Sequence, residues 1–171
     1  MILGNSTALL EPQIPALRRY AYALTRDHTA ADDLVQDCLE RAISRWYLRR
    51  SDTDLRAWLF TILHNLFITA QRVRRRRPLH DSIDDHADTV ASVPPAQEGG
   101  LLGRDILVQF AALSEDHQEV LLLAGIEELA YSSVAAILGV PVGTVMSRLS
   151  RAREALRRRL EGEATMLRRV K

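Results

Sequence analysis

The sequence predicts an all-α protein with two small helical domains joined by an acidic flexible linker, the C-terminal domain being a helix-turn-helix. Apolar residues recur at three- and four-residue steps on both sides of residues 78–103, and no strand-like alternation persists. Residues 78–103 contain no Lys or Arg and three of the six prolines, which is typical of a linker. Since so long a linker is unusual inside one compact domain, we divide the chain into 8–77, 78–103 and 104–171.

Length and composition limit the possible functions. The 171 residues suit one ordinary domain or two small ones. No apolar run reaches the roughly 18–20 residues that a membrane span needs, and residues 1–5 lack a basic region before an apolar stretch, so we expect a soluble cytoplasmic protein without membrane association. The single cysteine excludes an internal disulfide and a multi-thiolate metal site.

The net charge of +1 conceals a separation of charges along the chain. All basic residues except Lys171 are arginines, and they gather at 72–77 and 148–169. Acidic residues gather at 27–40 and 81–88. Basic blocks favour a polyanionic partner, and acidic blocks favour a basic partner or self-shielding. Any one block is equally consistent with a solvated helix face.

Two helices are predicted before residue 50. The first carries an apolar stripe over 17–24. The second starts at a cap supplied by Asp27 or Thr29 and continues to Trp46. Its apolar stripe includes Cys38, which we interpret as a small buried residue without a redox role.

A third helix is predicted over 54–75, and one of its faces is polar and aromatic. An aromatic ring, an amide and a run of cations are typical of surfaces that bind single-stranded bases. Trp58 is equally compatible with a core position, and Arg74–Arg77 with phosphate positioning. The residues of this face are Trp58, Thr61, Asn65, Thr69 and Arg72.

The spacing from Tyr131 to Val145 predicts a helix-turn-helix. Ala135 is small where two helices approach, and Gly139 permits the turn. The second helix then exposes a polar and basic N-terminal face that suits a DNA major groove, although a helical hairpin with a solvated basic end has the same pattern. That face comprises Thr144, Ser147, Arg148 and Arg151, with Arg153 beside it.

In order along the chain, these segments resemble the extracytoplasmic-function (ECF) sigma factors, small two-domain members of the sigma-70 family of bacterial RNA polymerase initiation factors. Residues 31–42 (ADDLVQDCLERA) resemble the polymerase-binding helix, and 55–66 (LRAWLFTILHNL) the promoter-melting and −10 segment. Residues 138–156 resemble the −35 helix-turn-helix. The stretches 58–63 and 65–68 are most similar to the general-stress-response subgroup of alphaproteobacteria.

The resemblance implies a non-catalytic specificity subunit, without cofactor or metal, that directs core RNA polymerase to promoters. Its partners would be the β′ coiled coil, the β flap, promoter DNA and an anti-sigma factor in a stress response. The implied polymerase-binding residues are Asp33, Leu34, Gln36 and Asp37. The implied −10 residues are Trp58, His64, Asn65, Thr69, Arg72, Arg74 and Arg75, with Asn65 lining the pocket for a flipped base. The implied −35 residues are Thr144, Met146, Ser147, Arg148, Arg151 and Arg153.

Two positions depart from the family pattern. Ala130, Ser132 and Ser133 stand where many members have a hydroxyl cap and two glutamates, so we expect the short helix to start late, at Ser132. Met146 replaces the usual Arg or Lys at the first −35 contact, which removes a phosphate or guanine contact.

Two other classes of function remain as alternatives. A stand-alone helix-turn-helix regulator would need neither the acidic helix nor Asn65. A nucleic-acid hydrolase would need a metal, for which His80, Asp81, Asp84, Asp85 and His86 are the candidates. A solvated linker explains that cluster better, because a mobile loop without a packed surround holds metals poorly.

Overall fold

The computed structural model describes residues 8–49, 54–76 and 101–169, and within these ranges every regular element is helical. The chain begins with η1 (Glu11–Gln13), α2 (Ile14–Thr25), α3 (His28–Ser44), η2 (Trp46–Leu48) and α4 (Leu55–Arg76). It continues with α5 (Leu101–Ala111), α6 (Glu115–Val120), the π-helical η3 (Leu121–Ile126), α7 (Tyr131–Leu138) and α8 (Val142–Arg169). Most of the predicted linker lies outside the described residues, but 101–103 are the first turn of α5 and not linker.

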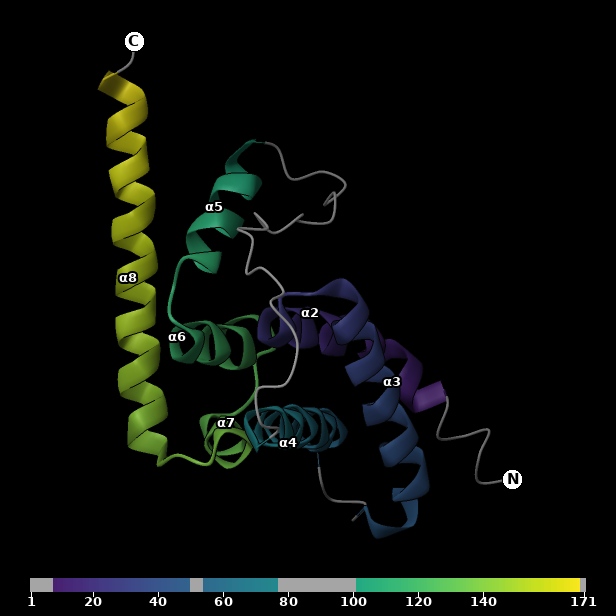
Figure 1. The fold of residues 1–171 in the computed structure, drawn as a ribbon. Coiled ribbons are helices and arrows are strands. Elements are labelled where there is room, and N and C mark those ends of the chain that lie inside the picture. Colours follow the sequence, from purple (N-terminus) through teal and green to yellow (C-terminus); the bar gives the residue numbers. More distant parts are fainter. Residues whose placement is uncertain (1–7, 50–53, 77–100, 170–171) are drawn as a thin grey trace.

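Figure 1 shows the N-terminal helices α2, α3 and α4 on one side and the C-terminal helices α5 to α8 on the other, with α8 running along the outer edge. α4 contacts α7, and α2 contacts α6. The larger cluster of buried residues therefore crosses between the two groups, joining Leu59 and Leu63 of α4 to Leu123 and Val134. A smaller cluster packs α8 against α6 through Leu149 and Val120.

The predicted start of α3 is confirmed, because the Asp27 carboxylate accepts a hydrogen bond from the backbone N–H of Ala30 at 2.6 Å. The predicted end is wrong: α3 stops at Ser44, and Trp46 lies in the short η2 turn. Cys38 is fully buried as predicted, and its Sγ lies 3.5 Å from the Leu59 carbonyl oxygen. Burial raises the pKa of this thiol to about 12, so it stays protonated.

The helix-turn-helix is present, with α7 and α8 bent by 99° at their break. Gly139 ends α7 in the left-handed conformation (φ 65°), as its place in the turn predicted. Val145 is buried in the cluster that also holds Val134 and Ala135 of α7, and Leu149 is buried in the smaller cluster with Val120. The expected late start at Ser132 is wrong: α7 begins at Tyr131, since the first turn is closed by the backbone bond from Val134 to the Ala130 carbonyl.

A wide turn leads out of the π-helical η3. The Glu127 N–H donates to the carbonyl of Leu122, five residues back, and the Leu129 N–H donates to that of Leu123. Glu128 takes a positive φ of 53° to close this turn. The result is that Glu127 lies in the interior while Glu128 is exposed.

No single described helix is both long and apolar enough to cross a membrane. Taken together, α7 and the part of α8 up to Glu161 reach that length and composition, but as a bent pair.

Candidate nucleic-acid interface

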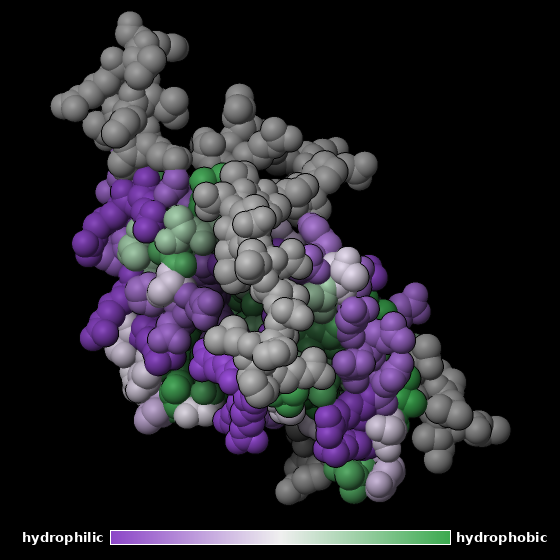
Figure 2. Space-filling view, viewed as in Figure 1, coloured by the Kyte–Doolittle hydropathy of each residue, from purple (hydrophilic) through white to green (hydrophobic). Residues whose placement is uncertain are grey.

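The acidic surface predicted for the second helix lies on α3. Asp33, Gln36 and Asp37 are exposed, and the Gln36 amide donates to the Glu40 carboxylate at 3.1 Å. Leu34 is buried in the core beneath this surface. In Figure 2, hydrophilic residues predominate on the side where α3 lies, with some hydrophobic residues among them. The arrangement presents carboxylates to solvent one helical turn apart, which suits a cationic partner.

The polar face of α4 gathers part of the predicted −10 set. Asn65, Thr69 and Arg72 are exposed at steps of four and three residues, so they lie along one face. Arg74 and Arg75 are exposed in the last turns. This face offers an amide, a hydroxyl and cations to an unpaired strand.

Two predicted −10 residues are placed differently. Trp58 is half-buried, with its ring edge-to-face against Trp46 at 6.2 Å between centroids. His64 is buried, and its Nδ1 is hydrogen-bonded to the Tyr20 hydroxyl at 3.0 Å. Burial lowers the pKa of His64, which keeps the ring neutral. In this arrangement of helices His64 cannot reach a DNA strand.

The predicted −35 residues lie on the first turns of α8. Met146, Ser147, Arg151 and Arg153 are exposed, while Thr144 is half-buried. The Ser147 hydroxyl donates to the Thr144 carbonyl at 3.0 Å, which leaves its oxygen able to accept from a partner. The sixth residue, Arg148, is held in an ion pair with Asp116 of α6.

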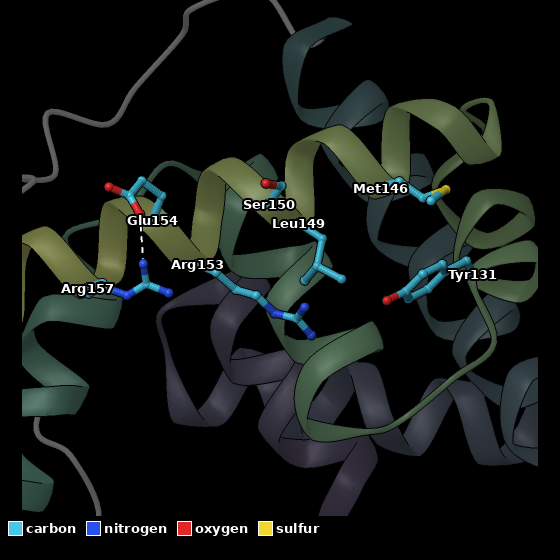
Figure 3. A pocket seen from close by; sticks show the side chains of 7 residues that line it. All are labelled: Tyr131, Met146, Leu149, Ser150, Arg153, Glu154 and Arg157. Carbon is cyan, nitrogen blue, oxygen red and sulfur yellow. Dashed lines mark hydrogen bonds and ion pairs between the residues drawn. The ribbon is translucent and has the colours of Figure 1, made fainter.

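Sequence reasoning missed a shallow groove of about 390 Å³ beside this face. Figure 3 shows Met146 and Tyr131 together at one end and the Glu154–Arg157 ion pair at the other. Residues 146, 150, 153 and 157 recur at three- and four-residue steps, so the heptad-like spacing carried the signal. Its lining residues are Tyr131, Met146, Leu149, Ser150, Arg153, Glu154 and Arg157.

Two family models match the chain. Residues 10–64 match the model described as Sigma2 domain of PhyR, and residues 104–156 match Sigma-70, region 4. The ECF RNA polymerase sigma factor EcfG of Rhodopseudomonas palustris (strain TIE-1) is 39% identical over 143 residues, which are 84% of this chain and 78% of the relative. This chain is an ECF RNA polymerase sigma factor.

Other relatives of the sigma factor agree. SigL of Mycobacterium tuberculosis is 34% identical over 158 residues, 90% of this chain and 88% of the relative. The sigma factor RpoE of Bartonella quintana, solved in complex with the anti-sigma factor NepR, has a TM-score of 0.74 at 36% identity and covers 92% of this chain and 97% of its own. CnrH, solved with the cytosolic domain of CnrY, has a TM-score of 0.62 at 25% identity, covering 91% and 87%.

The matches cover both helical parts of the sigma factor, including the acidic helix and the helix-turn-helix. They decide against the stand-alone regulator, whose N-terminal part would have no reason to match a sigma domain. Among the described residues no group of three His, Cys, Asp or Glu side chains is placed to hold a metal. The metal candidates His80, Asp81, Asp84, Asp85 and His86 lie outside the described residues.

Proposed function

We propose that this sigma factor binds core RNA polymerase through α3, holds unpaired −10 bases on α4 and reads the −35 duplex with α8. The observation that carries this assignment is the presence of three exposed faces of different chemistry on three different helices. Carboxylates stand on α3, an amide with hydroxyl and cations on α4, and arginines with a serine on α8. In this proposal residues 8–77 and 101–171 are separate working units, and 78–100 connects them.

The α3 face meets the arginine-rich coiled coil of the β′ subunit through Asp33, Gln36 and Asp37, and residues 104–171 meet the β flap. Leu34, being in the core, keeps the register of this face instead of touching the partner. Asn65 accepts a flipped base, while Thr69 and Arg72 hold the neighbouring backbone. Flipping costs a few kcal/mol of stacking and pairing, which such contacts offset.

We further propose that the free protein is regulated by an anti-sigma factor in a stress response. Similarity to RpoE of Bartonella quintana in its complex with NepR, and to CnrH with CnrY, supports this. The chain performs no catalysis of its own and works in the cytoplasm, since core polymerase supplies the chemistry and acts on chromosomal DNA.

The deciding experiment is promoter binding with and without core polymerase, followed by run-off transcription from a genomic promoter library. We expect a promoter complex and transcripts only when core polymerase and the protein are both present. Tight, sequence-specific promoter binding by the free protein, with no effect of core, would overturn the proposal.

A further inference from the structure

Glu127 is a fully buried carboxylate at the junction of the two groups of helices: its side chain has 0% exposure. Arg19 of α2 donates to its Oε1 from Nε at 3.1 Å and from Nη2 at 2.8 Å. Arg56 of α4 donates to the other oxygen, Oε2, from Nη2. Both oxygens of one acid from the C-terminal helices are thus occupied by cations from the N-terminal helices.

A second polar link crosses the same junction. Arg26, just after α2, donates from Nη2 to the side-chain oxygen of Gln118 on α6. Gln118 is itself buried, and its Nε2 donates to the carbonyls of Ala111 and Leu113 at 3.1 and 2.6 Å. These two bonds fix the Gln118 side chain, so Arg26 forms its bond only when α2 is docked in the correct position.

Apolar contacts surround these links, because α4 packs on α7 and α2 on α6 within one continuous buried cluster. A carboxylate inside such a surface is costly unless its partners arrive in the correct register. Glu127 therefore permits one docking geometry of the two groups and penalises any other. The apolar residues supply attraction, and the charge supplies selectivity.

This docked geometry conflicts with reading a whole promoter. Elements named −10 and −35 are about 25 base pairs apart, which is about 85 Å of B-DNA at 3.4 Å per step. Helices α4 and α7, in direct contact here, cannot engage sites so far apart. The faces on α3, α4 and α8 are nonetheless exposed in the docked state, so each can bind a partner singly.

We propose that Glu127 is an intramolecular latch: its ion pairs with Arg19 and Arg56 hold the free sigma factor closed, and their release is required before both promoter elements are bound. Each of the three side chains regains water when the groups separate, so opening is accessible to a partner such as core polymerase. Closed molecules cannot bind both promoter elements at once, and the open fraction therefore scales the apparent affinity for a whole promoter. The closed geometry stands on the contacts alone, whereas the two statements about promoter binding rest on the proposed function.

The test compares Glu127→Gln with Glu128→Gln in the full-length protein. Both changes remove one negative charge from adjacent positions, but Glu128 is exposed. By small-angle X-ray scattering we expect a larger radius of gyration for Glu127→Gln, no change for Glu128→Gln, and equal helical circular dichroism for both. An unchanged radius for Glu127→Gln would overturn the latch.

The double variant Arg19→Gln with Arg56→Gln tests the same contacts from the other side. It leaves the Glu127 carboxylate unpaired if the groups stay docked, so we expect opening here too. Because these arginines are 51% and 35% exposed, their replacement keeps the claim testable if Glu127→Gln loses helicity. Adding Glu127→Gln to the double variant should open the protein no further, because the double variant has already removed the ion pairs of Glu127.

The transcriptional consequence is measured with core polymerase and promoter DNA. We expect Glu127→Gln to speed promoter-complex formation by about tenfold, the change that about 1.4 kcal/mol of relieved closure would give. An opened variant with an unchanged rate would overturn the claim that closure limits promoter binding. Failure of the proposed function would give a different result, because then neither the parent protein nor any variant would form a promoter complex that depends on core polymerase.

Discussion

Arg148 of α8 forms an ion pair with Asp116 of α6, with 3.1 Å between Nη2 and Oδ2. The guanidinium thus bridges two helices that also share a buried apolar cluster. Arg151, three residues further along α8, is exposed. Arg148 and Arg151, both among the proposed −35 residues, are therefore in different situations: Arg148 is held against the protein and Arg151 faces solvent.

Replacing each by alanine should separate these situations. We expect Arg151→Ala to weaken −35 duplex binding by about 1–3 kcal/mol if it contacts a base, without altering stability. Arg148→Ala should weaken binding and also lower the free energy of unfolding by up to about 1 kcal/mol. Fluorescence anisotropy with DNA and urea unfolding measure the two effects. Arg158→Ala is the control, since Arg158 pairs with Glu154 outside the proposed contacts, and an equal loss of binding there would contradict the assignment.

Asn65→Ala should reduce open-complex formation while sparing duplex −35 binding, because the amide is proposed to hold only an unpaired base. Permanganate reactivity of −10 thymines, in the presence of core polymerase, measures the melting. Gln71→Ala removes an amide from α4 at a position outside the proposed set and serves as the control. Intact melting in Asn65→Ala would show that the pocket lies elsewhere.

Asp37→Arg should abolish association with core polymerase without unfolding α3, since the residue is exposed and the helix keeps its Asp27 cap. The cause is charge reversal against a cationic partner. Co-purification with core and far-UV circular dichroism are the measurements. Glu11→Arg makes the same change at an exposed residue away from α3, and its retention of core would locate the effect. Unchanged co-purification of Asp37→Arg would count against the α3 face.

Gly139→Ala should destabilise the helix-turn-helix by about 1–2 kcal/mol, because an alanine is strained at a φ of 65°. Beyond Gly139 and its two chain neighbours, no atom lies within 4 Å of the added methyl, so the cost comes from the local backbone conformation and not from a clash with distant residues. Gly143→Ala is the matched variant: its site is equally open but helical, and it should stabilise by up to about 1 kcal/mol. Thermal unfolding distinguishes them, and changes of the same sign would refute the argument.

Glu119 predicts a pH dependence of stability. Its pKa is raised from 4.5 to about 7, first by burial and then by the charges of Asp116 and Glu115, with Arg148 opposing. Because the folded carboxyl binds its proton more tightly than the unfolded one, the free energy of unfolding falls as the pH rises from about 4.5 to about 7.

Glu119→Gln should remove this loss, so its stability relative to the parent should be greater at about pH 7.5 than at about pH 5.5. Urea midpoints at both pH values provide the measurement. His64 acts in the opposite direction, since its pKa is lowered and its contribution grows as the pH rises towards 6.5. That contribution is common to parent and variant and cancels in the comparison. A difference independent of pH would show that Glu119 titrates normally.

Local patterns predicted the helices well. The apolar spacing of α3 and α4, the Asp27 cap and the Gly139 turn depend on neighbours within a few residues, and the structure confirms them. The end of α3 was predicted too late. Trp46 continues the apolar spacing of the helix although it lies in the short η2 turn that follows, so the spacing alone does not show where α3 ends.

Tertiary placement was beyond the reach of those patterns. His64 follows the same helical spacing as exposed residues, but it is buried, and its partner is the Tyr20 hydroxyl, 44 residues away in the sequence. Glu127 is an ordinary charged residue in sequence, and only the arrival of Arg19 and Arg56 makes its burial tolerable. Polar groups with distant partners carry no periodic signal, so they are found only when the chain is folded.

The π-helical segment Leu121–Ile126 has a consequence for how this chain can vary. A π-helical hydrogen bond spans one residue more than an α-helical one, so deleting one residue from the wide turn would change its winding and displace the residues that follow. The carboxylate of Glu127 would then no longer meet Arg19 and Arg56, although the sequence on either side of the deletion was unchanged. Substitutions here are a lesser threat than a change in length, and natural variation should preserve the number of residues more strictly than their identity.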